Sequence, residues 1–534
     1  MSFEIGPGQG FCGIETEYGV LGPSSNPVLL STWVVEAYKG MLGDQVAAWD
    51  YGSEDPLNDA RGFRLDRAAA HPSLLTDDPA RPAPGVEGDE GAGGGAALRV
   101  EPLAAGRALR PAARLSNGPG AVLLPNGGRL YVDHAHPEYA TPEVAGAWEA
   151  ALWDKAGERI MARAAAGLER AGTPVSLYKN NTDGKGASYG THENYLVARA
   201  VPFEHVVSVM TTFLVTRQVY TGSGRVGLGQ RSQEAGFQLS QRADYIEAEV
   251  GLETTLNRPI VNTRDEPHAD AARWRRLHVI VGDATLMDVA TYLRVGTCLA
   301  VLRAMEAGAF SDQFVERVRL ANPVAAFHEV SRDLTVTRPL ALANGETATA
   351  VELQREYLTA VADGAGLSGD IVERWAGLLE GLASEPLALG RQIEWVAKYQ
   401  LLDGLRRRGG LTWAAPKLAA ADLQWSDTNP ARSLFRRVEA SGAVEVLFDE
   451  AAVAGATGEP PASSRAYLKG QAVRRFGRTG VPQAGWDTLT LAWDGGSARV
   501  VLPEPAQGSK AQVGEMVEAA SGPADLAERL LASA

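Results

Sequence analysis

The chain has 534 residues, of which 45% are hydrophobic and 22% charged, and its net charge is −14. This length predicts one large domain with a smaller one, or two to three domains. The acidic balance argues against nonspecific nucleic-acid binding, which needs an excess of Lys and Arg. The only two cysteines, Cys12 and Cys298, exclude a disulfide framework and a CxxC metal site.

No targeting or membrane signal is expected from the sequence. The first residues, MSFEIGPGQG, contain neither a basic region nor an apolar one. The longest apolar stretch, around residues 286–305, is interrupted by Asp288, Arg294 and Arg303, so it does not predict a membrane-spanning helix. With so few cysteines, these features predict a protein of the reducing cytoplasm, with neither membrane nor nucleic acid as a partner.

Taken in chain order, apolar periodicity and turn residues predict a mixture of strands and helices, which is an α+β fold. Strands are expected at residues 11–20, 128–133, 175–179, 193–198, 236–244, 260–263, 277–281, 486–494 and 498–502. Helices are expected at residues 32–38, 144–171, 203–221, 286–306, 464–476 and over most of 350–410. The Thr141-Pro142-Glu143 stretch resembles a helix start, with an N-cap followed by Pro.

Residues 51–120 lack the periodicity of either a helix or a strand. Their first half, beginning YGSEDPLNDARGF, is rich in turn residues and predicts an ordered, functional loop. Their second half is rich in Gly, Ala and Pro and predicts a flexible linker. The pattern changes again near residue 430, which predicts a large domain over 1–430, including this loop, and a small domain over 431–534.

Four of the stretches place polar side chains at every second position. In a β-strand, alternate side chains share one face. The pairs or triplets that would share a face are Glu15 with Glu17, Arg129 with Tyr131 and Asp133, His192 with Asn194, and Arg276 with His278. If the four strands belong to one sheet, its polar face collects carboxylates, imidazoles and guanidinium groups. Such a face can hold metal ions and a nucleotide triphosphate.

The carboxylates carry the most specific chemistry, although each has a plainer interpretation. Glu15 and Glu17 repel each other unless a cation lies between them, but they could also line an exposed sheet edge. Asp133 ends a strand and is followed by two histidines and Glu138. It can serve as a general base or a nucleophile. Alternatively, it caps a turn with the histidines packed under it.

Two further stretches are less specific. The loop KNNTDGKGASYGT before His192 is rich in backbone donors, which suits phosphate or substrate, but it also fits an ordinary hairpin. The Arg-rich run before His278 suits phosphates, whereas Arg273 and Arg275 also fit a solvated helix face with salt bridges. The sequence contains no Walker A, Rossmann glycine, HExxH or GxSxG motif.

These same stretches carry a family resemblance. The motifs GIETEYG, RLYVDHAHPEY, YKNN, DGKGASYG, HENYL, GFQLSQR, GLETTLNRPIVNTRDEPHAD and RRLHVIVGDA resemble those of the deamidases and depupylases of Pup. These enzymes are relatives of the Pup ligases, in the carboxylate-amine ligase branch of the glutamine synthetase-like superfamily. The resemblance extends to RAYLKGQAVRRFG and AGWDT near the C-terminus. The loop after Trp49 resembles the insertion of the deamidases, although it reads GSEDPLND where ESPLRD is typical, and the linker after it is longer than usual.

The resemblance implies a glutamine synthetase-like antiparallel β-sheet cradle packed by helices, a small C-terminal domain, and ATP and Mg²⁺ as cofactors. It implies Mg²⁺ ligands at Glu15, Tyr131, Glu138, His192 and His278, with Glu17 as a further ligand. It implies ATP contacts from Arg276, Asn194, Thr141 and Trp486. Asp133 would be the catalytic carboxylate.

The activity implied is hydrolysis of the side-chain amide of the C-terminal Gln of Pup, and of the isopeptide bond between Pup and substrate lysines. Pup and pupylated proteins would be the partners. The motifs leave open whether Asp133 activates water or attacks directly, or whether a nucleotide-derived phosphate is the nucleophile. The alternatives are a Pup–protein ligase that consumes ATP and a catalytically idle Pup-binding module. Because Pup is acidic, a basic groove is expected, with candidates Arg225, Arg231, Arg242, Arg474 and Arg475.

Overall fold

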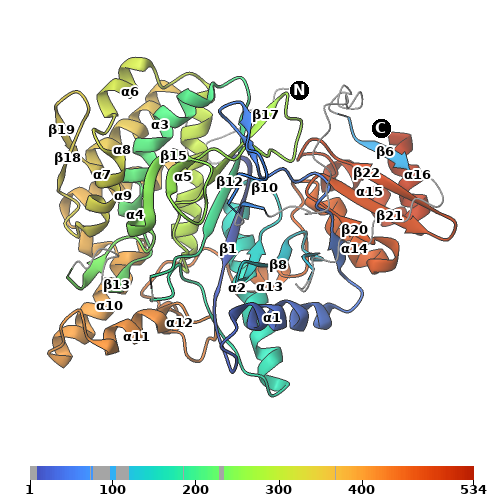
Figure 1. Ribbon diagram of the computed structural model, residues 1–534, viewed down its shortest axis with the longest axis horizontal. Coiled ribbons are helices and arrows are strands. Elements are labelled where there is room, and N and C mark those ends of the chain that lie inside the picture. The colour runs from blue at the N-terminus through green and yellow to red at the C-terminus, as the bar shows by residue number, and fades with distance from the viewer. Residues whose placement is uncertain are drawn as a thin grey trace.

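The structure is a computed structural model that describes residues 9–71, 74–75, 97–103, 120–184, 186–227, 234–366 and 369–533. One large sheet passes through the middle of the molecule (Figure 1). Helices α3 to α9 gather at one end of it, and α14 to α16 pack on the strands at the other end. Within the described ranges, no helix is both long and apolar enough to cross a membrane.

The large sheet has 12 strands, in the order β17-β12-β1-β9-β8-β7-β3-β20-β21-β22-β6, with β10 paired to β1. The strands are β1 (Gln9–Glu17), β3 (Ala47–Trp49), β6 (Arg99–Pro102), β7 (Val122–Leu123), β8 (Arg129–Asp133), β9 (His136–Ala140), β10 (Val144–Gly146), β12 (Thr191–Ala198), β17 (Trp274–Val279), β20 (Gln483–Ala484), β21 (Thr488–Trp493) and β22 (Gly496–Val501). Its described pairs are antiparallel except for β3 with β20. The expected α+β fold built on an antiparallel sheet is therefore confirmed.

Smaller strand pairs and the helices surround this sheet. The smaller strands are β2 (Gly19–Leu21), β4 (Asn58–Asp59), β5 (Phe63–Arg64), β11 (Ser176–Tyr178), β13 (Arg225–Gly227), β14 (Gly236–Gln238), β15 (Ile246–Gly251), β16 (Arg258–Asn262), β18 (Pro339–Ala341) and β19 (Thr347–Thr349). The helices are α1 (Pro27–Leu42), α2 (Ala147–Arg170), α3 (Phe203–Thr216), α4 (Gln218–Thr221), α5 (Asp288–Glu306), α6 (Asp312–Val318), α7 (Pro323–Arg332), α8 (Ala350–Thr359), α9 (Asp370–Ser384), α10 (Glu394–Gly409), α11 (Pro416–Trp425), α12 (Leu434–Ala440), α13 (Glu450–Ala456), α14 (Ala466–Gly480), α15 (Lys510–Ala519) and α16 (Pro523–Ser533).

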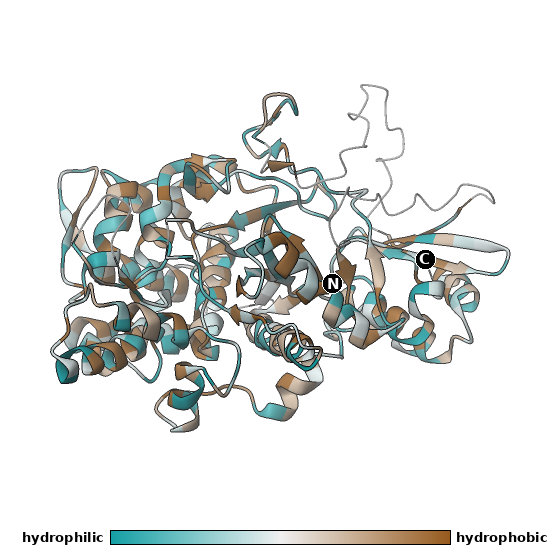
Figure 2. Cartoon of the chain, turned by 60° about the horizontal axis from the view of Figure 1, so that its bottom comes forward, coloured by the Kyte–Doolittle hydropathy of each residue, from teal (hydrophilic) through white to brown (hydrophobic). Residues whose placement is uncertain are grey.

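The two faces of β1 differ in polarity, and this difference positions the site. Cys12 and Ile14 point into the larger core, where they pack with side chains of α2 and α5. Because side chains alternate along a strand, Glu15 lies on the opposite face. Helix α5 is almost entirely buried, including its polar residues Asp288 and Arg294. Helices at the outside of the molecule carry brown and teal residues side by side along their length (Figure 2).

Helix α2 begins later than the sequence predicted. The helix start predicted at Thr141-Pro142-Glu143 is wrong, because the next three residues form β10 and pair with β1. The helix starts at Ala147, after Gly146. The Thr141 hydroxyl instead accepts a hydrogen bond of 3.0 Å from the backbone N–H of Ile14, which fixes it beside the polar face of the sheet.

The described part of the 51–120 segment is folded against the rest of the protein. Asp59 in β4 accepts a 2.7 Å hydrogen bond from the hydroxyl of Thr263, and the N–H of Ala60 donates to the Thr263 carbonyl. Within the predicted flexible linker, β6 pairs with β22. The remainder of that linker, residues 76–96 and 104–119, lies outside the described residues.

The predicted division near residue 430 stays a prediction. Side chains of α12 and α13 belong to the larger core. The smaller core draws its C-terminal side chains from Tyr467 onward and also contains Trp49 and Leu123. Because β20 to β22 continue the large sheet, the C-terminal segment and the rest of the chain share one sheet.

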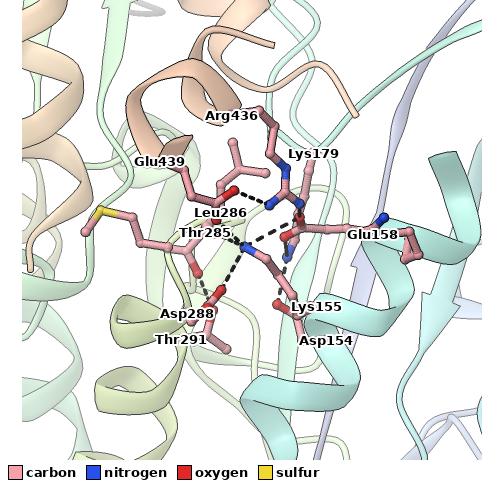
Figure 3. Close-up of polar contacts among 12 residues, drawn as sticks. Asp154, Lys155, Glu158, Lys179, Thr285, Leu286, Asp288, Thr291, Arg436 and Glu439 are labelled. Atoms are coloured by element: carbon pink, nitrogen blue, oxygen red, sulfur yellow. Dashed lines mark hydrogen bonds and ion pairs between the residues drawn. The ribbon is translucent and has the colours of Figure 1, made fainter. Parts of the chain in front are cut away.

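A buried network of ion pairs ties α2 to the start of the 179–191 loop and to α12 (Figure 3). Lys179 Nζ lies 2.7 Å from Asp154 Oδ2 and 2.9 Å from Glu158 Oε1. The second oxygen of Glu158 accepts from Arg436 Nη2 at 2.7 Å. The side chains of Lys179, Asp154 and Glu158 are nearly inaccessible to solvent, and burial opposes the charge of each of them.

Replacing Lys179 by Met should lower the free energy of unfolding by about 3–5 kcal/mol, because the buried Asp154 loses its cation and the buried Glu158 loses one of its cations. Urea unfolding followed by circular dichroism measures this change. The matched control is Lys39→Met, which breaks the exposed Lys39–Glu36 pair and should cost less than about 1 kcal/mol. Equal losses in the two variants would contradict this account of the network.

Candidate functional site

The four polar stretches lie on neighbouring strands, so the expectation that they share one sheet is confirmed. Glu15 on β1 pairs directly with His192 on β12. On the next strand, Asn194 of β12 pairs with His278 of β17. On the other side of β1, Glu17 pairs with Glu138 of β9. Glu138 in turn pairs with Tyr131 of β8.

Two cavities adjoin this polar face. One, of about 280 Å³, is lined by Glu15, Tyr131, Asp133, Glu138, His192, His278, Arg276 and Trp486 among others. A smaller one, of about 70 Å³, is lined by Thr141, Asn194, Arg276, Trp486 and Glu15 together with apolar residues of β1. The structure thus gathers the predicted metal, catalytic and nucleotide residues, apart from Glu17, around two adjoining spaces that share Glu15, Arg276 and Trp486.

The first group of possible metal ligands is Glu15, His192 and His278, whose ligand atoms all lie within 4.8 Å of one another. His192 Nδ1 lies 3.5 Å from Glu15 Oε2. His278 Nδ1 donates to Asn194 Oδ1 at 2.9 Å, and this bond directs the other ring nitrogen toward the site. That nitrogen, Nε2, is buried and has no hydrogen-bond partner among the described residues, so its lone pair is available to a metal ion.

The electrostatics favour ligand-competent forms of Glu15 and His278. Burial, followed by the charge of Arg276, holds the pKa of His278 well below its usual value, so the imidazole is neutral at pH 7. Burial opposes ionisation of Glu15, but the hydrogen bond and charge of His192 outweigh it and lower the pKa of that carboxyl. A carboxylate and a neutral imidazole are both ready to bind a cation without first losing a proton.

The second group consists of Glu17, Asp133 and Glu138, again with ligand atoms within 4.8 Å of one another. All of its ligand atoms are carboxylate oxygens, which Mg²⁺ prefers. Burial and the neighbouring charge of Asp133 raise the pKa of Glu138 well above its usual value. In Asp133, burial is outweighed by the hydrogen bond and charge of His134, and the pKa is lowered. The ionised form is therefore favoured at Asp133, and the protonated form is favoured at Glu138.

A cation bound to this second group should displace the proton of Glu138, so its affinity should fall as the pH falls. The affinity falls in this direction because the pKa of Glu138 is raised. Below that pKa, the ion must compete with a proton bound to the carboxylate. Isothermal titration with Mg²⁺ in buffers of different ionisation enthalpy measures the protons released. Proton release should be lost in Glu138→Gln, and an equal release from wild type and this variant would contradict the assignment.

Glu17 lies between the carboxylates and the 179–191 loop. Its Oε1 accepts a 2.6 Å hydrogen bond from the backbone N–H of Gly190, and its Oε2 lies 3.0 Å from His136 Nδ1. The ring of His136 stacks on Tyr189 with centroids 4.3 Å apart. Both rings line a third cavity of about 830 Å³. Through its contact with His136, Glu17 connects the carboxylate group to the lining of this cavity.

Several residues that the sequence did not predict also belong to the site. Glu54, from the 51–75 loop, accepts from Arg129 at 3.2 Å and from the Trp49 indole at 2.7 Å. The Arg129 guanidinium also lies over the Tyr131 ring, 4.1 Å from its centroid. Glu266 accepts from Arg276 at 3.1 Å. No periodic signal marks Glu54 or Glu266, because both reach the site from loops.

His268 was also missed, although it lines both cavities at the polar face. Its backbone is held in the left-handed region, with φ of 48°, and its carbonyl accepts a 2.6 Å hydrogen bond from Arg465 of the C-terminal segment. Burial, followed by the charge of Arg276, keeps the pKa of its imidazole well below the usual value. The motif RDEPHAD contains this residue, but an unusual backbone angle leaves no trace in the sequence.

The expected basic groove does not form from the residues proposed for it. Arg225 and Arg242 are buried, and Arg225 is paired with Asp244 at 2.9 Å. Arg474 pairs with Glu459, and Arg475 donates to the carbonyls of Glu518 and Ala520. Arg231 lies outside the described residues. The prediction was wrong for the four described arginines, because the sequence did not show that the fold would bury them or bind them to local partners.

The assembly of carboxylates, neutral imidazoles and a buried arginine on an antiparallel sheet has the donor groups that a divalent cation and a phosphate-bearing ligand need. The chain belongs to the Pup-ligase family, whose sequence profile, described as Pup-ligase protein, matches residues 10–490. It is 44% identical to the Pup deamidase/depupylase of Mycobacterium tuberculosis (strain ATCC 25618 / H37Rv), over 98% of this chain and 99% of the relative.

Other relatives and solved structures agree with this placement. The depupylase of Acidothermus cellulolyticus is 46% identical over 95% of this chain and 96% of its own. The complex between Pup and its ligase PafA matches with a TM-score of 0.73 and 27% identity, over 97% of this chain and 93% of that chain. PafA in complex with ADP matches with a TM-score of 0.67 and 34% identity, over 74% and 89% respectively.

Proposed function

We propose that this protein is a Pup deamidase and depupylase. It would hydrolyse the side-chain amide of the C-terminal Gln of Pup, giving Glu, and cleave the isopeptide bond between Pup and substrate lysines. Of the relatives that match nearly its full length, the one at 44% identity is named Pup deamidase/depupylase and the one at 46% is named depupylase. The observation in the structure that carries the proposal is the ionised Asp133 at the end of β8, grouped with Glu17 and Glu138.

Both reactions are attack on the same carbonyl, that of the side chain of the C-terminal residue of Pup. As a general base, Asp133 would take a proton from water while the water oxygen attacks this carbonyl, and the departing nitrogen would leave as ammonia or as the lysine amine. As a nucleophile, Asp133 would form an anhydride that water then opens. Both routes need a carboxylate, and the lowered pKa of Asp133 supplies one. A phosphate derived from the nucleotide is a third possible nucleophile.

The proposal includes ATP and Mg²⁺ as cofactors, and the residues present suit them. Bound Mg²⁺ would polarise the carbonyl and offset developing negative charge. Glu15, Glu17, Tyr131, Glu138, His192 and His278 would hold it. Arg276, Asn194, Thr141 and Trp486 surround the space of about 70 Å³ proposed for part of the nucleotide. A solved relative, PafA, was obtained in complex with ADP, which supports a nucleotide site in this family.

A Pup–protein ligase is the second candidate, because the solved neighbours are the ligase PafA. The segment 51–71, which resembles the deamidase insertion, favours the hydrolase. Pup and pupylated proteins are the partners that the proposed function requires. The cytoplasmic location predicted from the sequence remains a prediction.

One preparation tests the proposal against both alternatives. It is incubated with ATP and Mg²⁺ and separately with Pup ending in Gln, with a Pup–protein conjugate, and with Pup ending in Glu plus an acceptor protein. Ammonia release and loss of the conjugate are expected. New conjugate without ammonia release would establish the ligase instead. Pup binding without either reaction would establish an idle binding module.

A further inference from the structure

Two buried cations of the C-terminal segment lie close to the smaller cavity at the polar face. Lys469 of α14 is 1% exposed, and Arg465, one helical turn earlier, is 0% exposed. The reaction proposed above uses neither of them. Burying two cations within one turn of a helix is costly unless their partners compensate for the lost water, so their contacts need an explanation.

Lys469 holds the turn that joins β20 to β21. Its Nζ donates to the carbonyl of Gly485 at 3.1 Å and to the carbonyl of Trp486 at 2.6 Å. The same nitrogen lies 5.7 Å from the centre of the Trp486 ring. One ammonium group that binds two consecutive carbonyls fixes the peptide between them. It thereby fixes the direction in which the Trp486 side chain leaves the backbone.

Trp486 is the side chain through which this turn reaches the site. Its half-buried ring lines both the cavity of about 70 Å³ and the cavity of about 280 Å³. It packs edge to face on Trp49, with ring centroids 4.9 Å apart, and its centroid lies 6.1 Å from that of His268. An indole in this position offers a flat face to a nucleobase or a ribose in the smaller cavity.

Arg465 holds two other residues that line the smaller cavity. Its Nε donates to Glu143 Oε2 at 2.7 Å, and its Nη2 donates to Glu143 Oε1. The same Nη2 donates to the carbonyl of His268 at 2.6 Å. Lys469 Nζ lies farther from Glu143, 3.8 Å from Oε2. Because Arg465 occupies both oxygens of this carboxylate, Lys469 is the less fully compensated of the two cations.

The electrostatics distinguish the two cations. Burial lowers the pKa of Lys469 to about 8; the charge of Arg465 acts in the same direction, and those of Glu143 and Asp487 oppose it. In Arg465, burial is outweighed by the charge of Glu143, and the pKa is raised. Arg465 therefore keeps its charge at any ordinary pH. Lys469 is protonated at neutral pH and loses its proton as the pH rises through about 8.

We propose that Lys469 is a positioning residue for the nucleotide, and that its ammonium group holds the 485–487 turn so that Trp486 presents its ring to a bound nucleoside diphosphate or triphosphate. This inference rests on the nucleotide part of the proposed function. Lys469 acts through Trp486 and does not touch the reacting atoms. Loss of its charge should therefore weaken nucleotide binding and leave the chemical step unchanged once nucleotide is bound.

The first test is isothermal titration with ADP in the presence of Mg²⁺. Lys469→Met should raise the Kd for ADP about tenfold, the loss expected for an interaction that involves a charged group. In wild type, the Kd should rise as the pH increases from about 7 to about 9.5, with the change centred near the pKa of Lys469 at about 8. The Lys469→Met variant should show no such rise.

The second test separates positioning from chemistry. In the deamidation of Pup ending in Gln, Lys469→Met should raise the KM for ATP about tenfold and leave kcat within about twofold of wild type. Trp486→Ala should also weaken ADP binding. Adding Lys469→Met to Trp486→Ala should then cost little more, because the lysine acts through the ring that is already missing.

Lys398→Met is the matched control. Lys398 is also 1% exposed, donates to the carbonyl of Gly224 at 2.9 Å and lies 3.1 Å from Asp422. Its Nζ lies 5.9 Å from the ring of Trp425, so its surroundings resemble those of Lys469. It belongs to α10, toward the opposite end of the molecule from α14 (Figure 1). Its loss should leave the Kd for ADP unchanged, and an equal rise in this control would overturn the assignment.

Several outcomes would overturn the inference and leave the proposed function intact. They are an unchanged Kd in folded Lys469→Met, a wild-type Kd that does not rise with pH, and a lowered kcat with an unchanged KM for ATP. If Lys469→Met does not fold, Lys469→Gln removes the same charge, and the wild-type pH profile needs no variant. Absence of ADP binding by wild type would overturn the nucleotide part of the proposed function, and this inference with it.

Discussion

Asp133→Asn should lower Pup deamidation and depupylation together, by roughly 10²- to 10⁴-fold. The amide of Asn has nearly the shape of the carboxylate, but it can neither accept a proton from water nor form an anhydride. The pKa of Asp133 is lowered in the folded protein, so the wild-type group is ionised at neutral pH and the substitution removes a real charge. Initial rates of ammonia release and of conjugate loss measure the effect.

Pup binding should survive this substitution, because Asp133 lies at the reaction centre. Fluorescence anisotropy with labelled Pup checks it. Asp494→Asn is the matched control, since Asp494 is an exposed acid in the turn between β21 and β22, and it should keep wild-type rates. Full activity of Asp133→Asn would remove Asp133 from the mechanism. A parallel loss of binding would show instead that it holds the substrate.

Removing divalent cations with a chelator should lower both activities by roughly 10³-fold, the equivalent of several kcal/mol of charge stabilisation. The two groups together place six side chains that could bind a metal ion on one face of the sheet. Without a cation, their carboxylates repel one another and the attacked carbonyl is not polarised. Activity should return as Mg²⁺ is added back, and the midpoint of the recovery gives the metal requirement.

Ligand variants connect this requirement to the site. Glu15→Gln and His278→Gln should each raise the Mg²⁺ concentration needed for half-maximal rate by at least about tenfold. Glu36→Gln, at an exposed carboxylate of α1, should leave that concentration unchanged. Chelation without effect on either activity would contradict a metal-assisted reaction. An unchanged requirement in both ligand variants would mean that the metal binds elsewhere.

The sequence alone determined which side chains share a face of each strand. Side chains alternate along any strand, so Glu15 must lie on the same side as Glu17, and Arg129 on the same side as Asp133, whatever surrounds them. The same local rule separated Asp133 from its neighbour His134. In the structure, His134 forms the turn after β8 with φ of 50° and bonds Asp133 from outside the strand. The apolar residues between the polar ones determined that the other face would be a core.

Only the tertiary structure decided how these faces combine. The order of β17, β12, β1, β9 and β8 divides the acids and histidines into two groups, and it places Asp133 with Glu17 and Glu138. Hydrogen bonds between strands far apart in the chain set that order, and no local pattern encodes it. The same is true of Glu54 and Glu266, which reach the site from loops, and of the burial of Lys469. Its partner Glu143 comes from a distant segment, so its loss of solvent and its lowered pKa arise only when the chain folds.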